Sequence, residues 1–198
     1  IWNDRHGYDN ALEAIDESLA RLNIGYVDML LIHWPNPKLG KFVETWKALE
    51  HALESGKVRG IGVSNFHPEH LEQLLEQANV LPALNQVELH PGLNQAEIRA
   101  FNANHGIATE AWSPLARGQK NETQAILAAA EAHGKTPAQV ILRWHIQLGN
   151  LVIPKSSHPD RLAENFNVFD FELSEHHMQL IATLNTETRI ATNPDDMN

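Results

Sequence analysis

Polar and aromatic side chains recur at the ends of the five segments that we expect to be strands. His33, Ser64, Gln86, Trp112 and Lys155 each lie at or just beyond the end of a short apolar run. In a parallel α/β fold the carboxyl ends of the strands meet on one face, where active sites are built. Strand ends are also often polar because they are wet, but recurrence on every strand weakens that explanation. The pattern predicts one site assembled from all five segments.

A basic cluster follows the last of these segments. Lys155, Ser156, His158 and Arg161 place two fixed cations, a hydroxyl and an imidazole near the start of a short helix that opens with Pro159. Such a group at a helix N-terminus suits a phosphate, although an ordinary solvated helix start has the same composition. The formal net charge is -10, so an anionic ligand requires a locally basic pocket of this kind.

The hydrophobic periodicity predicts alternating strands and helices. Strands are expected at 26–33, 58–63, 84–89, 107–112 and 151–154. Helices are expected from an Asn10–Glu13 cap to Leu22, from 42 to 55, from Pro68, from an Asn94–Glu97 cap, at 121–134, at 136–148, after Pro159 and from Ser174 to Leu184.

This alternation requires crossover connections and therefore a parallel sheet, either doubly wound or a (β/α)8 barrel. No G-x-G-x-x-G turn follows a strand, which favours the barrel over a dinucleotide-binding Rossmann fold. A barrel closes with eight strands, so five strands in 198 residues predict an incomplete TIM barrel, strands 4 to 8 with their helices. We expect residues 1–198 to form a single domain.

The bulk composition narrows the function classes. No apolar run approaches the roughly 20 residues of a membrane helix, and the negative charge disfavours nucleic acid and anionic lipid. The absence of cysteine favours a reducing, cytoplasmic location. The chain begins with Ile1 and shows no signal peptide, so we expect further residues upstream.

Five short motifs occur in the order in which the aldo-keto reductase family carries them. They are Leu31-Ile-His-Trp-Pro35, Gly62-Val-Ser-Asn-Phe66, Asn85-Gln-Val-Glu88, Trp112-Ser-Pro-Leu115 and Ile153-Pro-Lys-Ser156. The chain resembles this family from residue 1 to about residue 190, including Phe169-Asp-Phe-Glu-Leu173 before the last helix. The resemblance implies NADPH-dependent reduction of aldehydes or ketones to alcohols on a TIM barrel.

The resemblance also implies a role for each motif. His33 polarises the carbonyl oxygen of the substrate, and Trp2 and Trp34 wall the substrate pocket. Contacts to the nicotinamide are implied for Ser64, Asn65, Gln86 and Trp112, and contacts to the cofactor are implied for Ser113 and Leu115. Of these, the hydroxyl and amide groups hold the carboxamide, while Trp112 stacks on the ring.

The resemblance assigns the adenosine half of NADPH to the basic cluster. The resemblance implies that Lys155, Ser156, His158 and Arg161 contact the 2'-phosphate, which favours NADPH over NADH. It further implies that Glu164 and Asn165 contact the adenine. Many relatives carry Tyr where this chain has Trp112, which is similar to the bacterial 2,5-diketogluconate reductase branch.

The chain departs from the family in its catalytic groups. The family tetrad is Asp, Tyr, Lys and His, and His33 is the one member with a counterpart here. Tyr8 at a helix start and Tyr26 at a strand start are not placed to substitute. We therefore expect the amino-terminal third, with the Asp, Tyr and Lys, to lie upstream of Ile1, and the isolated chain to be inactive.

Two other functions stay open: a non-catalytic nucleotide-binding or sensing protein of the same fold, and a purely structural piece of a barrel. His67 with His70, or His176 with His177, could bind a metal, but no motif supplies a third ligand, so none is expected. The expected partner is a small carbonyl substrate. A complete parent is expected to be monomeric, while exposed sheet edges could make an incomplete barrel self-associate.

Overall fold

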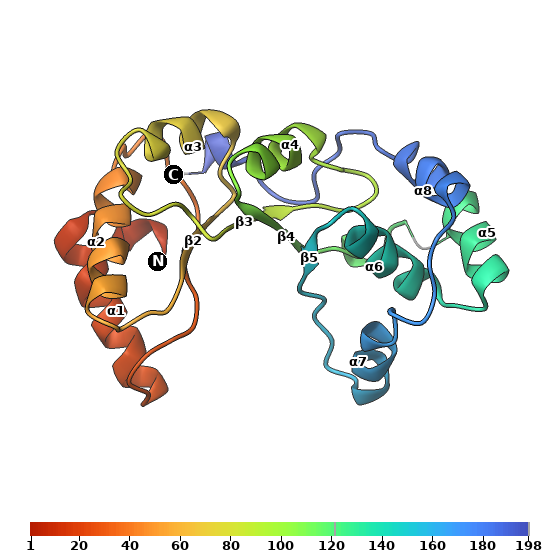
Figure 1. The fold of residues 1–198 in the computed structure, drawn as a ribbon, viewed down its shortest axis with the longest axis horizontal. Helices are drawn as coiled ribbons and strands as arrows, with labels where there is room; N and C mark the ends of the chain where they lie inside the picture. Colours follow the sequence, from red (N-terminus) through yellow and green to blue (C-terminus); the bar gives the residue numbers. More distant parts are fainter. Residues whose placement is uncertain (121, 198) are drawn as a thin grey trace. The chain divides into compact units, whose positions relative to one another are not determined.

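A computed structural model of the chain describes residues 1–120 and 122–197. Five strands form a parallel sheet in which hydrogen-bonded neighbours follow chain order (Figure 1). They are β1 (Leu30–Ile32), β2 (Ile61–Ser64), β3 (Leu84–Glu88), β4 (Ala108–Trp112) and β5 (Leu151–Val152). Doubly wound sheets reverse their strand order at a switch point, whereas barrels do not. The strand order therefore agrees with the expected incomplete barrel.

The chain divides into two compact units. The first comprises Ile1–Gln86, Glu97–Ala108 and Thr192–Asn198, and the second comprises Val87–Ala96 and Thr109–Ala191. Strand β3 passes from the first unit into the second.

The first unit packs α1 (Tyr8–Leu22), α2 (Phe42–Glu54), α3 (Pro68–Leu75) and most of α4 (Ala96–Asn104) with β1 and β2. Its core includes Ile32, Phe42, Trp46, Leu49, Ile61, Val63, Phe66, Leu71 and Leu74. All four residues of β2 are buried, as expected for a strand covered on both faces. A Cβ at Gly62 would lie 2.8 Å from both Leu31 Cδ2 and the Leu84 carbonyl oxygen, so this strand position needs glycine.

The second unit packs α5 (Gln124–His133) against α6 (Pro137–Gln147) and α8 (Glu175–Ala182), while α7 (Pro159–Phe166) contacts α6. Helix α6 begins with a capping box in which the Thr136 hydroxyl accepts from the Gln139 backbone N–H and the Gln139 side chain accepts from Thr136 N–H. The buried side chains of this unit include Ile126, Val140, Ile141, Leu142, Trp144 and Ile181. Helix α7 has no buried residue, so its position depends on polar contacts.

Several boundaries differ from the sequence prediction. The strand expected at 26–33 is regular over Leu30–Ile32, with an isolated bridge between Val27 and Val58. Asp28 and Met29 interrupt it, because Asp28 is exposed and pairs with Arg59 at 3.0 Å. The strand expected at 151–154 is likewise limited to Leu151–Val152.

Two predicted helix starts were also wrong. Helix α1 starts at Tyr8, so Asn10 lies inside it and its Nδ2 donates to the His6 carbonyl at 3.3 Å instead of capping the helix. Leu22, the last residue of this helix, is 58% exposed. Helix α5 begins at Gln124 rather than 121, a position that falls outside the described residues.

Three short 3-10 turns were not anticipated: η1 (Asn3–Arg5), η2 (Ala116–Gly118) and η3 (Pro194–Asp196). In the described part of the chain, no helix has the length and apolar character needed to cross a membrane.

Candidate functional site

The ends of β1, β2 and β3 are joined by a chain of hydrogen bonds within the first unit. Asn65 Nδ2 donates to the His33 carbonyl at 2.9 Å and lies 3.0 Å from Ser64 Oγ. Ser64 Oγ donates to the Gln86 carbonyl at 2.8 Å, and the Asn65 backbone N–H donates to the same oxygen at 2.8 Å. The structure therefore brings together His33, Ser64, Asn65 and Gln86, as the sequence predicted.

Ser64 and Asn65 contribute first to the architecture of these strand ends. Both are buried, and Asn65 adopts a left-handed backbone conformation with φ 64°. Asparagine tolerates this conformation better than most residues because its short amide can bond to nearby backbone. Gln86 is half-buried, so its side chain is more open than the other two.

The imidazole of His33 lies between two indoles. Its ring centroid is 4.8 Å from that of Trp2 and 6.2 Å from that of Trp34. Trp34 is buried, whereas Trp2 is 49% exposed and His33 is itself exposed. Partial burial of the ring and, second, the positive charge of the Ile1 amino group lower the pKa of His33 below its usual value, which favours the neutral imidazole at pH 7. A neutral imidazole can donate one hydrogen bond to a carbonyl oxygen.

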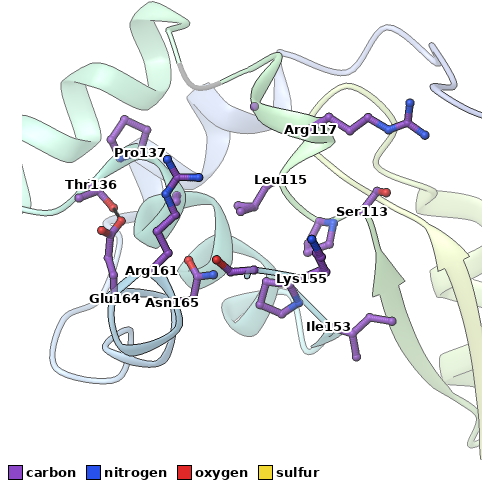
Figure 2. Close-up of a pocket in the computed structure, with 15 residues that line it drawn as sticks. Ser113, Leu115, Arg117, Thr136, Pro137, Ile153, Lys155, Arg161, Glu164 and Asn165 are labelled. Carbon is purple, nitrogen blue, oxygen red and sulfur yellow. Dashed lines mark hydrogen bonds between the residues drawn. The ribbon is translucent and has the colours of Figure 1, made fainter. Parts of the chain in front are cut away.

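A pocket of about 640 Å³ lies within the second unit (Figure 2). This volume falls within the roughly 300–1,000 Å³ typical of small-molecule sites. Its lining includes seven residues that the sequence predicted as cofactor contacts, namely Ser113, Leu115, Lys155, Ser156, Arg161, Glu164 and Asn165. They come from the loop after β4, the segment after β5, and α7. His158 and Trp112 do not line this pocket.

Three cations line the pocket: Arg117, Lys155 and Arg161. All three are exposed, and across residues 1–120 and 122–197 no carboxylate forms an ion pair with any of them. Figure 2 shows Arg117 and Arg161 on opposite sides of Leu115. In a chain of net charge -10, unpaired cations around one pocket make a local attraction for an anion.

The turn that starts α7 is held by its own side chains. Ser156 Oγ accepts from the His158 backbone N–H at 3.1 Å, and His158 is the exposed N-cap residue. The first-turn N–H groups of a helix attract anions, and Arg161 lies in this first turn.

Glu164 has a structural partner besides any ligand. Its Oε1 accepts from Thr136 Oγ1 at 2.6 Å, which ties α7 to the start of α6. Gln139 reinforces this tie, since its Nε2 donates to the carbonyls of Glu164 at 3.2 Å and Asn167 at 2.9 Å. The hydrogen bond to Thr136 leaves Glu164 less available to a ligand than the sequence indicated.

The loop after β4 has a strained backbone and is held by a hydrogen bond from α6. Ser113, Ala116 and Arg117 all have positive φ values of 49°, 47° and 53°, which non-glycine residues adopt at a cost. The buried His145 of α6 lies with Nε2 3.2 Å from the Pro114 carbonyl and with Nδ1 3.4 Å from Asn150 Nδ2. Since Nδ1 accepts from the amide, the proton is on Nε2 and is donated to the loop.

Sequence reasoning missed several of these groups. Arg117 and His145 carry no motif by themselves, and Thr136 was predicted to open a helix but not to contact Glu164. The nearest signal is the Ala116-Arg-Gly118 continuation of the Trp112-Ser-Pro-Leu115 motif, which places a cation just beyond a predicted cofactor loop.

A second polar cluster joins α3 to η3 within the first unit. Asp195 Oδ1 lies 2.9 Å from His67 Nδ1 and 3.6 Å from His70 Nε2, so the structure supplies the third group that no motif indicated. However, His70 Nδ1 accepts from the His67 backbone N–H at 3.1 Å, which leaves the proton of the neutral ring on Nε2. That nitrogen has no lone pair for a metal, so the cluster serves as a hydrogen-bonded tie.

A family model described as "Aldo/keto reductase family" matches residues 1–186. An aldo-keto reductase of Mycolicibacterium smegmatis is 54% identical over 198 residues, which cover 100% of this chain and 72% of the relative. A glyoxal reductase of Bacillus subtilis is 47% identical over 197 residues, 100% of this chain and 71% of the relative. Methylglyoxal reductase DkgA of Yersinia pestis is 44% identical over 197 residues, 98% of this chain and 70% of the relative.

Solved structures give the same result for the fold. The crystal structure of Gox0644 in its apoform superposes with a TM-score of 0.97 at 46% identity, covering 100% of this chain and 73% of that chain. A variant of Gox0644 in complex with NADPH superposes with a TM-score of 0.96 at 46% identity and the same coverage. The predicted incomplete α/β barrel is thereby confirmed.

Proposed function

This chain belongs to the aldo/keto reductase family, whose model it matches over residues 1–186, and from that premise we propose how it takes part in NADPH-dependent carbonyl reduction. The pocket of the second unit binds the adenosine end of NADPH, and His33 faces the carbonyl group of the substrate. The observation that carries the cofactor assignment is that Lys155, before α7, and Arg161, in its first turn, both line the pocket and have no carboxylate partner among the described residues. An additional phosphate is the feature that distinguishes NADPH from NADH.

The residues of the pocket fit the two anionic parts of the cofactor. Lys155 and Arg161 are suited to the 2'-phosphate, because a guanidinium and an ammonium form strong charge-assisted hydrogen bonds with phosphate oxygens. Arg117 lies across Leu115 from Arg161, on the side of Ser113, and is suited to the diphosphate. The amide of Asn165 can hydrogen-bond to the adenine edge.

His33 acts on the substrate side. NADPH, when bound, supplies a hydride to the carbonyl carbon. The neutral imidazole of His33 donates a hydrogen bond to the carbonyl oxygen, which becomes more negative as the reaction proceeds. Gln86 and Asn65 orient the carboxamide of the nicotinamide, and Trp2 and Trp34 wall the substrate pocket beside the imidazole.

The proton for the alkoxide requires an acid stronger than His33 alone offers. The ring of Tyr8 lies against His51, with centroids 6.4 Å apart, and Arg59 lies 4.0 Å from the ring centroid of Tyr26. Neither tyrosine is held by a lysine at the strand ends. This observation favours a second candidate function, in which these 198 residues bind the cofactor without efficient turnover. Turnover is measured directly as carbonyl-dependent loss of NADPH absorbance.

The substrate class is that of small carbonyl compounds. Relatives named glyoxal reductase and methylglyoxal reductase support aldehydes and 2-oxoaldehydes. A place in the 2,5-diketogluconate reductase branch, suggested by Trp112, is a narrower proposal. One domain over residues 1–198, a cytoplasmic location and a monomeric full-length parent are further proposals.

The proposed cofactor preference is tested by thermal unfolding of the chain with saturating NADPH or NADH. NADPH is expected to raise the Tm more than NADH, and the double variant Lys155→Ala, Arg161→Ala is expected to abolish that difference. The double variant Arg21→Ala, Lys38→Ala removes the same charge from the first unit and is expected to retain the difference. Equal Tm shifts for the two cofactors in the unmodified chain would refute the assignment.

A further inference from the structure

Helices α5 and α8 pack against each other in the second unit, and a pair of histidines joins them (Figure 1). His133 is the last residue of α5, and His177 lies in the first turn of α8. His133 Nε2 lies 3.4 Å from His177 Nδ1. From the sequence we had paired His177 with His176, its neighbour in the chain. The structure brings a second imidazole to His177 from 44 residues away.

Neighbouring groups hold the two histidines in this arrangement. The ring of His133 lies against Phe171, with centroids 5.5 Å apart. The His177 backbone N–H donates to Oγ of Ser174, the N-cap residue of α8, at 3.2 Å. Both histidines are half-buried, so their rings are supported on one side and accessible to solvent on the other.

The separation of the two nitrogens suits a metal ion better than a hydrogen bond. Ordinary N–H···O bonds in proteins span roughly 2.7–3.2 Å, so a contact of 3.4 Å is long for one. Two nitrogens that bind one zinc ion tetrahedrally, each at roughly 2.0–2.1 Å, lie about 3.3–3.4 Å apart. A zinc ion between the rings therefore requires little movement of either helix.

Both facing nitrogens can offer a lone pair. A neutral imidazole has one ring proton, and no group in the described part of the chain hydrogen-bonds to the outer nitrogens, His133 Nδ1 and His177 Nε2. The protons can therefore lie on the outer nitrogens. His70 differs, because its Nδ1 accepts from a backbone N–H and its Nε2 must keep the proton.

The surrounding charges also permit a cation. Lys135 lies 5.2 Å from the ring centroid of Phe171, but its ammonium group is paired with both carboxylate oxygens of Asp170, at 2.8 and 2.7 Å. Desolvation, followed by the nearby His133 and His176, lowers the pKa of His177, which favours the neutral ring that a metal ion requires.

We propose that His133 and His177 form a site for a divalent transition-metal ion, with zinc as the probe, that links the end of α5 to the start of α8. Imidazole nitrogen is a preferred ligand of such ions. Water completes the coordination, so the site is open and reversible, unlike a closed structural zinc site with four protein ligands. The proposal does not depend on carbonyl reduction or on the cofactor pocket.

The test is a zinc titration of the chain in competition with a chromophoric zinc indicator. His133→Gln and His177→Gln each remove one ligand, and each is expected to raise the Kd for zinc at least about tenfold. His105→Gln changes an exposed histidine of the first unit, and His176→Gln changes the neighbour of His177. Both controls are expected to keep the Kd of the unmodified chain. Thermal unfolding without zinc checks that all four variants fold.

Two outcomes of this titration overturn the proposal. The same Kd in all four variants would mean that zinc binds scattered single histidines. A raised Kd in His176→Gln but not in His133→Gln would place the site on α8 alone.

A second measurement uses the unmodified chain. Copper(II) binds the same ligands more tightly than zinc and broadens nearby NMR signals. At substoichiometric copper, the ring signals of His133 and His177 are expected to disappear before those of His67 and His70. Saturating zinc is expected to slow amide hydrogen exchange in the last turn of α5 and the first turn of α8. Earlier broadening at His67 and His70, or unchanged exchange with zinc bound, contradicts a link between these helices.

Discussion

The chemistry assigned to His33 depends on the neutral form of its ring. Partial burial of the ring and the positive charge of the Ile1 amino group lower its pKa, so the imidazole keeps a single ring proton at neutral pH. One N–H is enough to polarise a carbonyl oxygen, and the effect of removing such a donor is felt when charge develops on that oxygen.

In a protein that contains this chain and reduces carbonyls, His33→Ala is expected to lower kcat and kcat/KM together by about 10²–10³-fold. The Kd of NADPH is expected to change little, because the contacts assigned to the cofactor lie on other residues. Steady-state kinetics and a fluorescence titration with NADPH separate the two effects. A loss of cofactor affinity as large as the loss of kcat would assign His33 to cofactor binding.

A second histidine makes stability depend on pH. His6 is 2% exposed, neither ring nitrogen has a hydrogen-bond partner in the described structure, and burial lowers its pKa from 6.5 to about 4. The unfolded chain therefore takes up the proton at a higher pH than the folded one. Stability from the buried neutral ring is full above pH 6.5 and is lost as the pH falls toward 4.

The free energy of unfolding is expected to fall by about 2–3 kcal/mol from this group between pH 7 and pH 4. His6→Gln removes the titration and is expected to flatten that part of the profile, as measured by urea unfolding at a series of pH values. His176→Gln, at an exposed position of α8, is the control and is expected to leave the slope unchanged. The same slope in His6→Gln as in the unmodified chain would contradict the assignment.

Among the elements, helix α7 has no buried residue, and hydrogen bonds from α6 hold it in place. Gln139 caps α6 with its own side chain and donates to two carbonyls near the end of α7. One side chain thus links the start of one helix to the end of the other. Arg161, assigned to the 2'-phosphate, and Asn165, assigned to the adenine, lie on this supported helix.

Gln139→Ala is expected to destabilise the chain by about 1–2 kcal/mol, the combined effect of a lost cap and lost hydrogen bonds. It is also expected to speed amide exchange along α7 and to weaken NADPH binding without altering exchange in α1. Hydrogen exchange with and without NADPH measures both. If α7 kept its protection in this variant, its position would depend on contacts other than Gln139.

The elements could be predicted because each helix carries a local pattern, such as Thr136-Pro-Ala-Gln139 at the start of α6. The strands were predicted too long, since apolar composition does not show where pairing stops: Asp28 and Met29 read as strand but lie exposed. The pocket residues that belong to family motifs were predicted from the resemblance of those motifs to the family. The hydrogen bond between the Ile190 backbone N–H and Glu88 could not be predicted, because the two residues are 102 positions apart and no local signal reports such a contact.

At the scale of the whole molecule, charge is distributed unevenly with respect to the proposed cofactor. The chain has 15 basic and 25 acidic residues, yet Arg117, Lys155 and Arg161 line one pocket without ion-pair partners among the described residues. Because the net negative charge repels anions elsewhere on the chain, binding of an anion at this pocket is easier to detect. The pocket lies wholly within the second unit, so its ligand can be tested with a part of NADPH.

Calorimetric titration of the chain with adenosine 2'-phosphate and with adenosine 5'-phosphate is the direct test of the 2'-phosphate site assigned to Lys155 and Arg161. The two ligands have the same composition and charge and differ in where the phosphate is attached. Adenosine 2'-phosphate is expected to bind at least about tenfold more tightly, and Lys155→Ala with Arg161→Ala is expected to remove the difference. Equal affinities in the unmodified chain would mean that the pocket attracts phosphate without recognising the 2'-position, and would contradict the assignment of NADPH to this site.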